Sequence, residues 1–466
     1  MKNFLLKARI TPELMAKSLA LILAVFILIR WWHYIDTYSV NILFWDQWDL
    51  YGIFIENKNP WELFRVQFGP HRQGIGFILT KIIADISGWN IRAEAFTIGI
   101  IVCGAMIFAF AVKVRLTTPL SWADAAIPLM FLTPIQYEIF SGASNLSHGS
   151  VPLLLLVLYS LAWTSRSCIF RHISVLIINF FLIYTGFGVF AGIITPVFLA
   201  IECLYAFRNK SEKETGLCIA AILISLLSAG SFFVGYTFSP CVGNFQFPIP
   251  QYWKYPEFIA LALANFCGVK GVNDLSLFTG FIILFIMGGI GAVHIKRILK
   301  PDYWLNINSG KNISVVIVFL ISFTLIFCAN LAIGRVFLGM HAAQYSRYIP
   351  YIIPGYFAIY LHFAGLEQAR IKIFLMLGTV ICLIAATFPM RESDFRAMKW
   401  LAHGKTRWKA NYLQTENFKE TFRLTKAELP NFTIFPVPNS DLLLKKKLDY
   451  FKANKLNLYL DYPSQK

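Results

Sequence analysis

Long hydrophobic runs recur along this chain, and they constrain its fold more than any other feature. A helix needs about 20 apolar residues to cross about 30 Å of hydrocarbon, and the first such run covers Ser18 to Ile35. Hydrophobic residues make up 57% of the chain and charged residues only 14%, whereas about a quarter of a soluble chain is charged. The sequence therefore predicts an all-α, polytopic transmembrane protein, and its runs amount to about eleven spans.

Positive charge gathers in the short loops between these runs. The formal net charge is +17, and the bias of Lys and Arg toward cytoplasmic loops accounts for most of it. Lys2, Lys7, Arg9 and Lys17 precede the first span, which predicts a cytoplasmic N-terminus. No small-residue cleavage site follows that span, so we expect no cleaved signal peptide. No basic stripe with stacking aromatic residues lies outside the spans, and we therefore expect no nucleic-acid partner.

Two long segments, 38–88 and 237–274, fall on the outer side of the predicted spans. The first is amphipathic and predicts short helices at the membrane surface. Within the second, the apolar stretch 258–266 is too short to span and predicts a re-entrant or surface helix. The multispan domain accordingly covers residues 1–389, with these two outer loops.

A polar tail, 390–466, follows the last predicted span. It carries 15 Lys and Arg against 8 Asp and Glu, a net charge of +7 (15 − 8). The positive charge of the tail favours the inner side of the membrane, whereas the number of predicted spans places it on the outer side. The preference of positive charge for the inner side does not hold for long tails. The stretch "LLLKKKLDYFKANKLNLYL", 442–460, predicts an amphipathic helix lying on anionic lipid.

Paired acids mark the start of the first outer segment, in "NILFWDQWDLYGIF". Asp46 and Asp49 are three residues apart, so on a helix they share a face. At the border of oil and water a carboxylate loses part of its hydration, its pKa rises, and it becomes a better general base. The alternative is that the two acids only stabilise the N-terminus of a surface helix.

Cations follow in the same segment and in a late outer loop. In "QFGPHRQG", Gly69 and Pro70 interrupt the chain, and His71 and Arg72 begin the next expected helical run, where a cation suits a phosphate. In "QYSRYIP", Arg347 lies at the outer start of a span and can bind phosphate with its planar guanidinium. The flanking residues Gln344 and Tyr348 are further candidates for substrate binding. The alternatives are that these arginines contact lipid headgroups, or that they anchor the protein at the membrane–water interface.

Glu138 closes the third predicted span, about 123–140, in "PIQYEIF". It is a candidate second acid, and the alternative is an ordinary exposed span end. The eight cysteines are scattered without a CxxC pair, and no metal-ligand spacing stands out among them.

The segment "FWDQWD" followed by "GPHRQGIGF", together with many spans and a long first outer loop, resembles the GT-C superfamily of membrane glycosyltransferases. It is similar to bacterial glucosyltransferase-like proteins that decorate O-antigen or other surface glycans. The resemblance implies a catalytic base at Asp46 or Asp49, with Glu138 as an assisting acid. It also implies a polyprenyl-phosphate sugar donor and a glycan or lipid-linked glycan acceptor, at the periplasmic face of a bacterial inner membrane. A divalent metal ion is left open as a cofactor.

These observations favour a membrane glycosyltransferase. The cations would hold the leaving phosphate while a carboxylate takes the proton of the acceptor hydroxyl. A single displacement of this kind inverts the anomeric centre. Two other functions stay open. A transporter or flippase of lipid-linked sugars would carry ionisable residues deep in its spans. A non-catalytic partner in envelope assembly would not depend on the outer acids.

Overall fold

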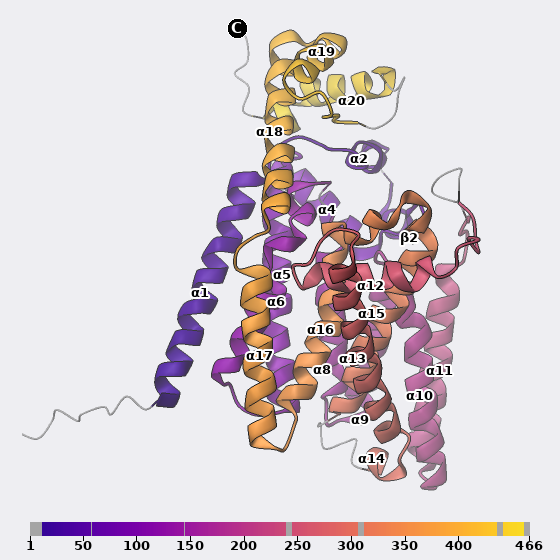
Figure 1. Ribbon diagram of the computed structural model, residues 1–466. Helices are drawn as coiled ribbons and strands as arrows, with labels where there is room; N and C mark the ends of the chain where they lie inside the picture. Colours follow the sequence, from indigo (N-terminus) through magenta and orange to yellow (C-terminus); the bar gives the residue numbers. More distant parts are fainter. Residues whose placement is uncertain are drawn as a thin grey trace, which may run out of the picture.

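A computed structural model describes residues 12–56, 58–143, 145–238, 245–305, 312–435 and 441–460. Over these ranges the protein is α-helical, and the strands described are limited to one two-stranded hairpin. Most helices run along a common direction and form one bundle, with a smaller group of helices above it (Figure 1). The protein is therefore an all-α membrane protein, as the hydrophobic runs predict.

Seven helices of the described ranges are long and apolar enough to cross a membrane. They are α1 (Pro12–Tyr38), α5 (Ile91–Leu116), α10 (Val189–Arg208), α11 (Glu212–Phe232), α13 (Asp274–Ile298), α15 (Ile313–Arg335) and α17 (Ala369–Thr387). Three shorter apolar helices, α8 (Ser150–Trp163), α9 (Cys168–Ile183) and α16 (Ile349–Ala364), pack among them, and α14 (Pro301–Leu305) follows α13. A count of eleven spans stays an expectation.

The third predicted span is broken into short pieces. These are η1 (Trp122–Ala125), α6 (Ala126–Phe131), η2 (Pro134–Gln136) and α7 (Glu138–Ser141). Proline has no backbone N–H to continue a helix, and the Thr133 side chain caps the new turn by accepting a hydrogen bond from Ile135 N. The expectation of one continuous helix over 123–140 is therefore wrong. The break puts Glu138 at the start of a short helix.

The first outer segment contains three helices, α2 (Gln47–Ile55), α3 (Pro60–Arg65) and α4 (Gly74–Ser87). Between α3 and α4 the chain turns back as a hairpin of β1 (Gln67–Phe68) and β2 (His71–Arg72), with Gly69 at φ 57°. A positive φ costs little for glycine, which explains the turn at this point. The expectation that His71 and Arg72 begin a helix is thus corrected, because α4 begins at Gly74.

The apolar stretch 258–266 forms part of α12 (Lys254–Phe266), which is buried between α13, α15 and the loop before α16. Gly280 of α13 lies so close to Ala260 that an added Cβ would come 1.9 Å from the Ala260 carbonyl oxygen. The helix therefore packs inside the protein, so the expectation of a surface helix is wrong, and the alternative of a re-entrant helix stays a prediction.

The polar tail folds into α18 (Glu392–Thr415), α19 (Phe418–Glu428), α20 (Asp441–Asn454) and η7 (Asn457–Tyr459). We call residues 392–460 the C-terminal module; Figure 1 shows its outer part above α2. The apolar side of α20 packs on α2, where Phe451 meets Trp48 with ring centroids 6.1 Å apart, and Leu448 is fully buried. The amphipathic helix exists, but its apolar face lies against protein and not against lipid.

Backbone and side-chain hydrogen bonds join the C-terminal module to the first outer segment. Trp45 N donates to Ile434 O at 3.0 Å, and Asn457 N donates to Gly88 O at 2.9 Å. The Asn41 side-chain amide donates to Asn457 O at 2.8 Å. The tail therefore lies on the same side of the bundle as segment 38–88, which the composition of the tail left undecided.

Candidate functional site

A pocket of about 340 Å³ opens where four parts of the chain meet. They are the start of the first outer segment, the turn after α7, the loop before α16 and the C-terminal module. Its polar and aromatic lining includes Trp45, Asp46, Gln47, Glu138, Asn145, His148, Tyr345, Arg347, Trp400, Asn431 and Thr433. Segments separated by more than 300 residues therefore build one site.

Asp46 faces this pocket from the N-cap position of α2. Its side chain makes no capping hydrogen bond, and Asp49 lies in the first turn of α2, so the alternative that the helix dipole stabilises the two acids stays open. Asp46 is exposed on the side of the pocket opening. The surrounding walls still remove part of the water around the carboxylate, which is the largest effect and raises the pKa of Asp46. The Arg347 cation opposes that rise, and the neighbouring Asp49 charge adds to it. The net result is a carboxyl with a pKa above its usual value.

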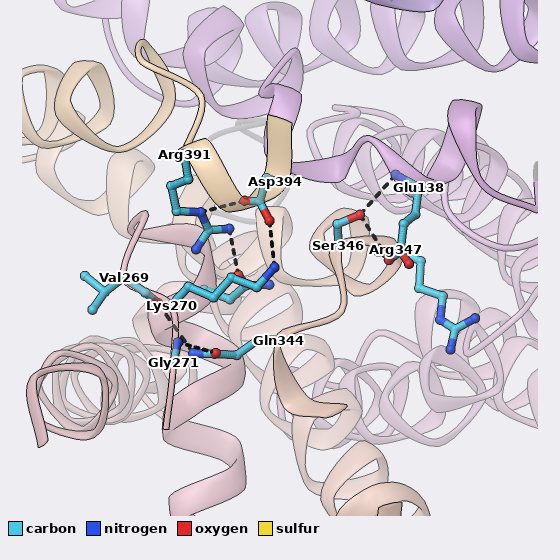
Figure 2. Close-up of polar contacts among 10 residues, drawn as sticks. Glu138, Val269, Lys270, Gly271, Gln344, Ser346, Arg347, Arg391 and Asp394 are labelled. Carbon is cyan, nitrogen blue, oxygen red and sulfur yellow. Dashed lines mark hydrogen bonds and ion pairs between the residues drawn. The ribbon is translucent and has the colours of Figure 1, made fainter. Parts of the chain in front are cut away.

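Arg347 and Glu138 lie next to each other in the lining of the pocket. The Glu138 carboxylate accepts hydrogen bonds from the Ser346 hydroxyl and from Arg347 N, each at 3.0 Å. In Figure 2 the Arg347 guanidinium extends away from these contacts. It stacks over the rings of Tyr345 and Tyr348, at 5.0 and 5.6 Å from their centroids. None of the ion pairs within the described ranges involves Arg347.

Neutral polar groups complete the floor of the pocket. Burial and the Arg347 cation lower the pKa of His148 to about 4, so its ring is uncharged near neutral pH. Its Nε2 atom is buried and has no hydrogen-bond partner among the described residues. The Asn145 amide donates to the Gln73 side chain at 3.3 Å, and its carbonyl accepts from Ser147 N. The floor can therefore offer a donor or acceptor without adding a second cation.

Two tryptophans expose their indole rings in the same pocket. Trp45 is 40% exposed and Trp400 is 38% exposed. Trp45 has a φ of 51°, which is rare for a bulky residue and is held by the Ile434 hydrogen bond. Trp400 comes from α18 and packs edge-on against Phe432 at 5.4 Å. Exposed aromatic faces suit an amphipathic ligand that has one apolar and one polar side.

Of the eight site residues predicted from sequence, the pocket is lined by Asp46, Glu138 and Arg347. Asp49 does not line it and is 53% exposed, with Lys447 Nζ 3.9 Å from its carboxylate. Arg72 is buried and donates to three carbonyl oxygens, those of Phe232, Arg65 and Val234, at 2.6 to 3.2 Å. Its guanidinium holds α11 to the hairpin.

The other three predicted residues also serve the surrounding structure. His71 is buried, and its Nδ1 lies 3.1 Å from Gly186 O. The Gln344 carbonyl accepts from Gly271 N at 2.7 Å, which fastens the loop after α12 (Figure 2). Tyr348 is buried beneath Arg347. The structure thus sets these residues behind the pocket wall.

Lys405 of α18 lies beneath the pocket and was not among the predicted residues. It is buried, and its ammonium donates to the carbonyls of Ser141 and Gly142 at 2.8 and 2.7 Å. Burial lowers the pKa of Lys405 to about 7. This contact links the C-terminal module to the turn that carries part of the pocket.

A second cationic cluster lies near this site, in the same close-up (Figure 2). Asp394 is fully buried and pairs with Lys270 and Arg391, at 2.6 Å each. Arg391 also donates to the Asn265 side chain at 2.9 Å, and its Nη1 atom is buried without a hydrogen-bond partner among the described residues. Arg391 borders an apolar cavity of about 850 Å³ between α13, α16 and α17.

Sequence reasoning places His148 among the polar groups of the outer face but assigns no site role to it or to the C-terminal module. Asn145 and His148 belong to a short polar run, "SNLSHGS", between two hydrophobic runs, and this run was the available signal. No such signal connects Trp400 or Thr433 to Asp46, because only the packing of α18 brings them together. No protein-family model, curated protein or solved structure matches the chain.

Proposed function

We propose that this protein is an integral-membrane glycosyltransferase of a bacterial inner membrane, with its active site on the periplasmic face. It transfers a sugar from a polyprenyl-phosphate donor to a surface glycan or a lipid-linked glycan. The single observation that carries the proposal is the pocket that Asp46, Glu138 and Arg347 line together with two exposed indole rings. A sugar has apolar ring faces and polar edges, so this combination of groups suits it.

The chemistry assigns one role to each charged group. The Asp46 carboxylate takes the proton of the acceptor hydroxyl, whose oxygen forms a bond with the anomeric carbon of the donor sugar. The bond between that carbon and the phosphate oxygen breaks, and the leaving phosphate keeps the electron pair. The Arg347 guanidinium stabilises its charge. A single displacement inverts the configuration at the anomeric carbon.

Glu138 acts through Arg347 in this proposal. Its carboxylate accepts from the Arg347 backbone N–H and from Ser346, and it therefore fixes the loop on which the guanidinium stands. A loop held at two points keeps the cation in place for the departing phosphate, which lowers the cost of reaching the transition state.

The apolar cavity supports a lipid-linked donor. It has about 850 Å³ of space, and its lining is mostly aliphatic and aromatic, as with Ile283, Phe363 and Phe374. Phe374 is 74% exposed, so the cavity borders the surface that faces lipid. An isoprenoid tail fits such a space, and the Lys270–Asp394–Arg391 cluster adds net positive charge at its α18 end.

Asp46→Asn is the test of the proposal, with Asp49→Asn as the matched control. We expect Asp46→Asn to lower transfer about 10²- to 10⁴-fold, because the acceptor loses its general base. Asp49→Asn should keep transfer, because Asp49 does not line the pocket. The measurement is the formation of glycosylated product from polyprenyl-phosphate sugar by purified full-length protein, with folding checked by gel filtration in detergent.

Wild-type activity in Asp46→Asn would remove Asp46 from the mechanism. Movement of labelled donor across vesicle membranes without a covalent product would show that the protein is a flippase and not an enzyme. If cells that carry each pocket variant kept the wild-type envelope, the protein would instead be a structural partner in envelope assembly.

A further inference from the structure

A separate cluster of metal-binding side chains lies at the opposite end of the helix bundle from the C-terminal module, where α9 begins, α10 ends and α11 begins. Cys168 and His172 are one helical turn apart on α9, Glu202 lies near the end of α10, and Cys218 is on α11. The ligand atoms of Cys168, His172 and Glu202 lie within 4.8 Å of one another. Two helices, α9 and α10, therefore bring sulfur, nitrogen and oxygen donors together, and Cys218 of α11 lines the adjoining cavity.

The orientation of the His172 ring is the first argument for a metal. Its Nε2 atom lies 3.1 Å from the Glu202 carboxylate, and a carboxylate that holds one ring N–H orients the other nitrogen for an ion, whose binding displaces the proton there. That other nitrogen, Nδ1, lies 3.9 Å from Cys168 Sγ. In a tetrahedral zinc site, sulfur and imidazole ligands are about 3.6 Å apart. The pair is thus near the spacing that a shared ion requires.

Space and charge give the second argument. A cavity of about 30 Å³, which is room for one ion, is lined by both thiols and by Glu202, together with Arg171 and Glu214. His172 does not line this cavity, but its ring contacts Glu202 and Cys168, which do. The buried thiol of Cys218 faces the same cavity as the Cys168 thiol. Arg171 pairs with the other carboxylate oxygen of Glu202 at 2.6 Å. Two thiolates and the carboxylates of Glu202 and Glu214 carry enough negative charge to compensate a divalent ion beside Arg171, as a buried cation requires.

We propose that Cys168, His172 and Cys218 bind one divalent ion of the zinc class, with Glu202 positioning the histidine. Thiolate and imidazole donors select zinc over magnesium or calcium. The ion would join α9 to α11 and would stabilise the bundle at the end that the charge rule assigns to the cytoplasm, where thiols stay reduced. The site is independent of the outer pocket, so the outcome of this proposal does not affect the sugar-transfer proposal.

The test uses full-length protein in detergent after treatment with a chelator. Titration with Co²⁺ should give thiolate-to-cobalt charge-transfer absorption that saturates at one ion per chain, and Zn²⁺ should abolish it. Cys168→Ser and Cys218→Ser should each lower the intensity of this absorption by about half, because each removes one of two sulfur ligands. Cys203→Ser is the matched control, since this thiol on α10 contacts the Thr215 carbonyl instead of the cluster.

Wild-type protein that gives no charge-transfer absorption with Co²⁺ would overturn the proposal, and so would absorption that survives both substitutions. A second readout needs no variant. Zn²⁺ should slow alkylation of the partly exposed Cys168 thiol by a maleimide, detected by mass spectrometry. An alkylation rate that does not change with Zn²⁺ would also contradict the site.

Discussion

At the scale of single residues, the candidate site depends on how the protein tunes two charges. Loss of water raises the pKa of Asp46, and Arg347 limits that rise. Arg347 in turn stands on a loop that Glu138 fixes. Two residues of the same chemical types lie outside the pocket. Asp49 is exposed beside Lys447, and Arg72 donates hydrogen bonds to backbone carbonyls.

The pH dependence of transfer should report the charge of Asp46. A general base acts when ionised, so activity should fall as pH drops through the raised pKa of Asp46. The Asp49 charge contributes to that rise, so Asp49→Asn should move the acidic limb to lower pH and leave the maximal rate unchanged. Transfer rates measured against pH for the wild type and Asp49→Asn check this. Acidic limbs that coincide in the two profiles would show that Asp49 does not influence the base.

Lys405 should make the stability of the protein depend on pH. Its pKa is about 7 in the folded protein, against a usual value of 10.5, so between these values the unfolded chain binds a proton that the folded chain does not. Stability should therefore rise with pH across this window and be lowest below it. Thermal unfolding midpoints should show a weaker rise in Lys405→Met than in wild type. Lys399→Met, an exposed control on α18, should keep the full rise.

At the scale of elements, α2 is held between the helix bundle and the C-terminal module. Trp48 is fully buried against Phe451 of α20, and the Lys447 ammonium donates to the Trp48 carbonyl. On its other side, the Tyr51 hydroxyl donates to Glu94 of α5. Because Asp46 is the N-cap residue of α2, the docking of α20 fixes the position of the proposed base.

Leu448→Ala should loosen that docking. Leu448 is fully buried on α20, and removing a buried leucine side chain costs about 2–5 kcal/mol. We expect faster proteolysis of the C-terminal module and a lower transfer rate, while the membrane helices stay inserted. Lys446→Ala, an exposed change on the same helix, should have neither effect. A Leu448→Ala protein with the protease resistance of the wild type would show that α20 does not hold the module.

At the scale of the whole molecule, the proposed active site is a composite of the membrane bundle and the tail. The pocket is lined by residues before position 150 and by residues after position 340. Figure 1 shows the C-terminal module above the bundle. The metal-binding cluster proposed for Cys168 and His172 lies at the other end. In these two proposals, one side of the molecule would carry the sugar chemistry, and the other would carry a structural ion.

Cysteine labelling in intact cells should test this orientation. In a variant without native cysteines, Asp49→Cys and Lys446→Cys should both react with a membrane-impermeant maleimide added from the periplasmic side. Glu214→Cys, at the start of α11, should react only after the inner membrane is opened. Labelling of Asp49→Cys and Lys446→Cys from different sides would contradict the packing of the module on α2.

The sequence by itself determined the membrane-spanning helical class, because runs of apolar residues must leave water wherever they lie. It also singled out Asp46, Glu138 and Arg347, since charges beside apolar runs stand out in composition. Only the tertiary structure decided that Asp49 and Arg72 lie outside the pocket, that 258–266 is buried, and that the tail supplies Trp400. These outcomes depend on contacts between residues far apart in the chain, and local sequence carries no record of such contacts.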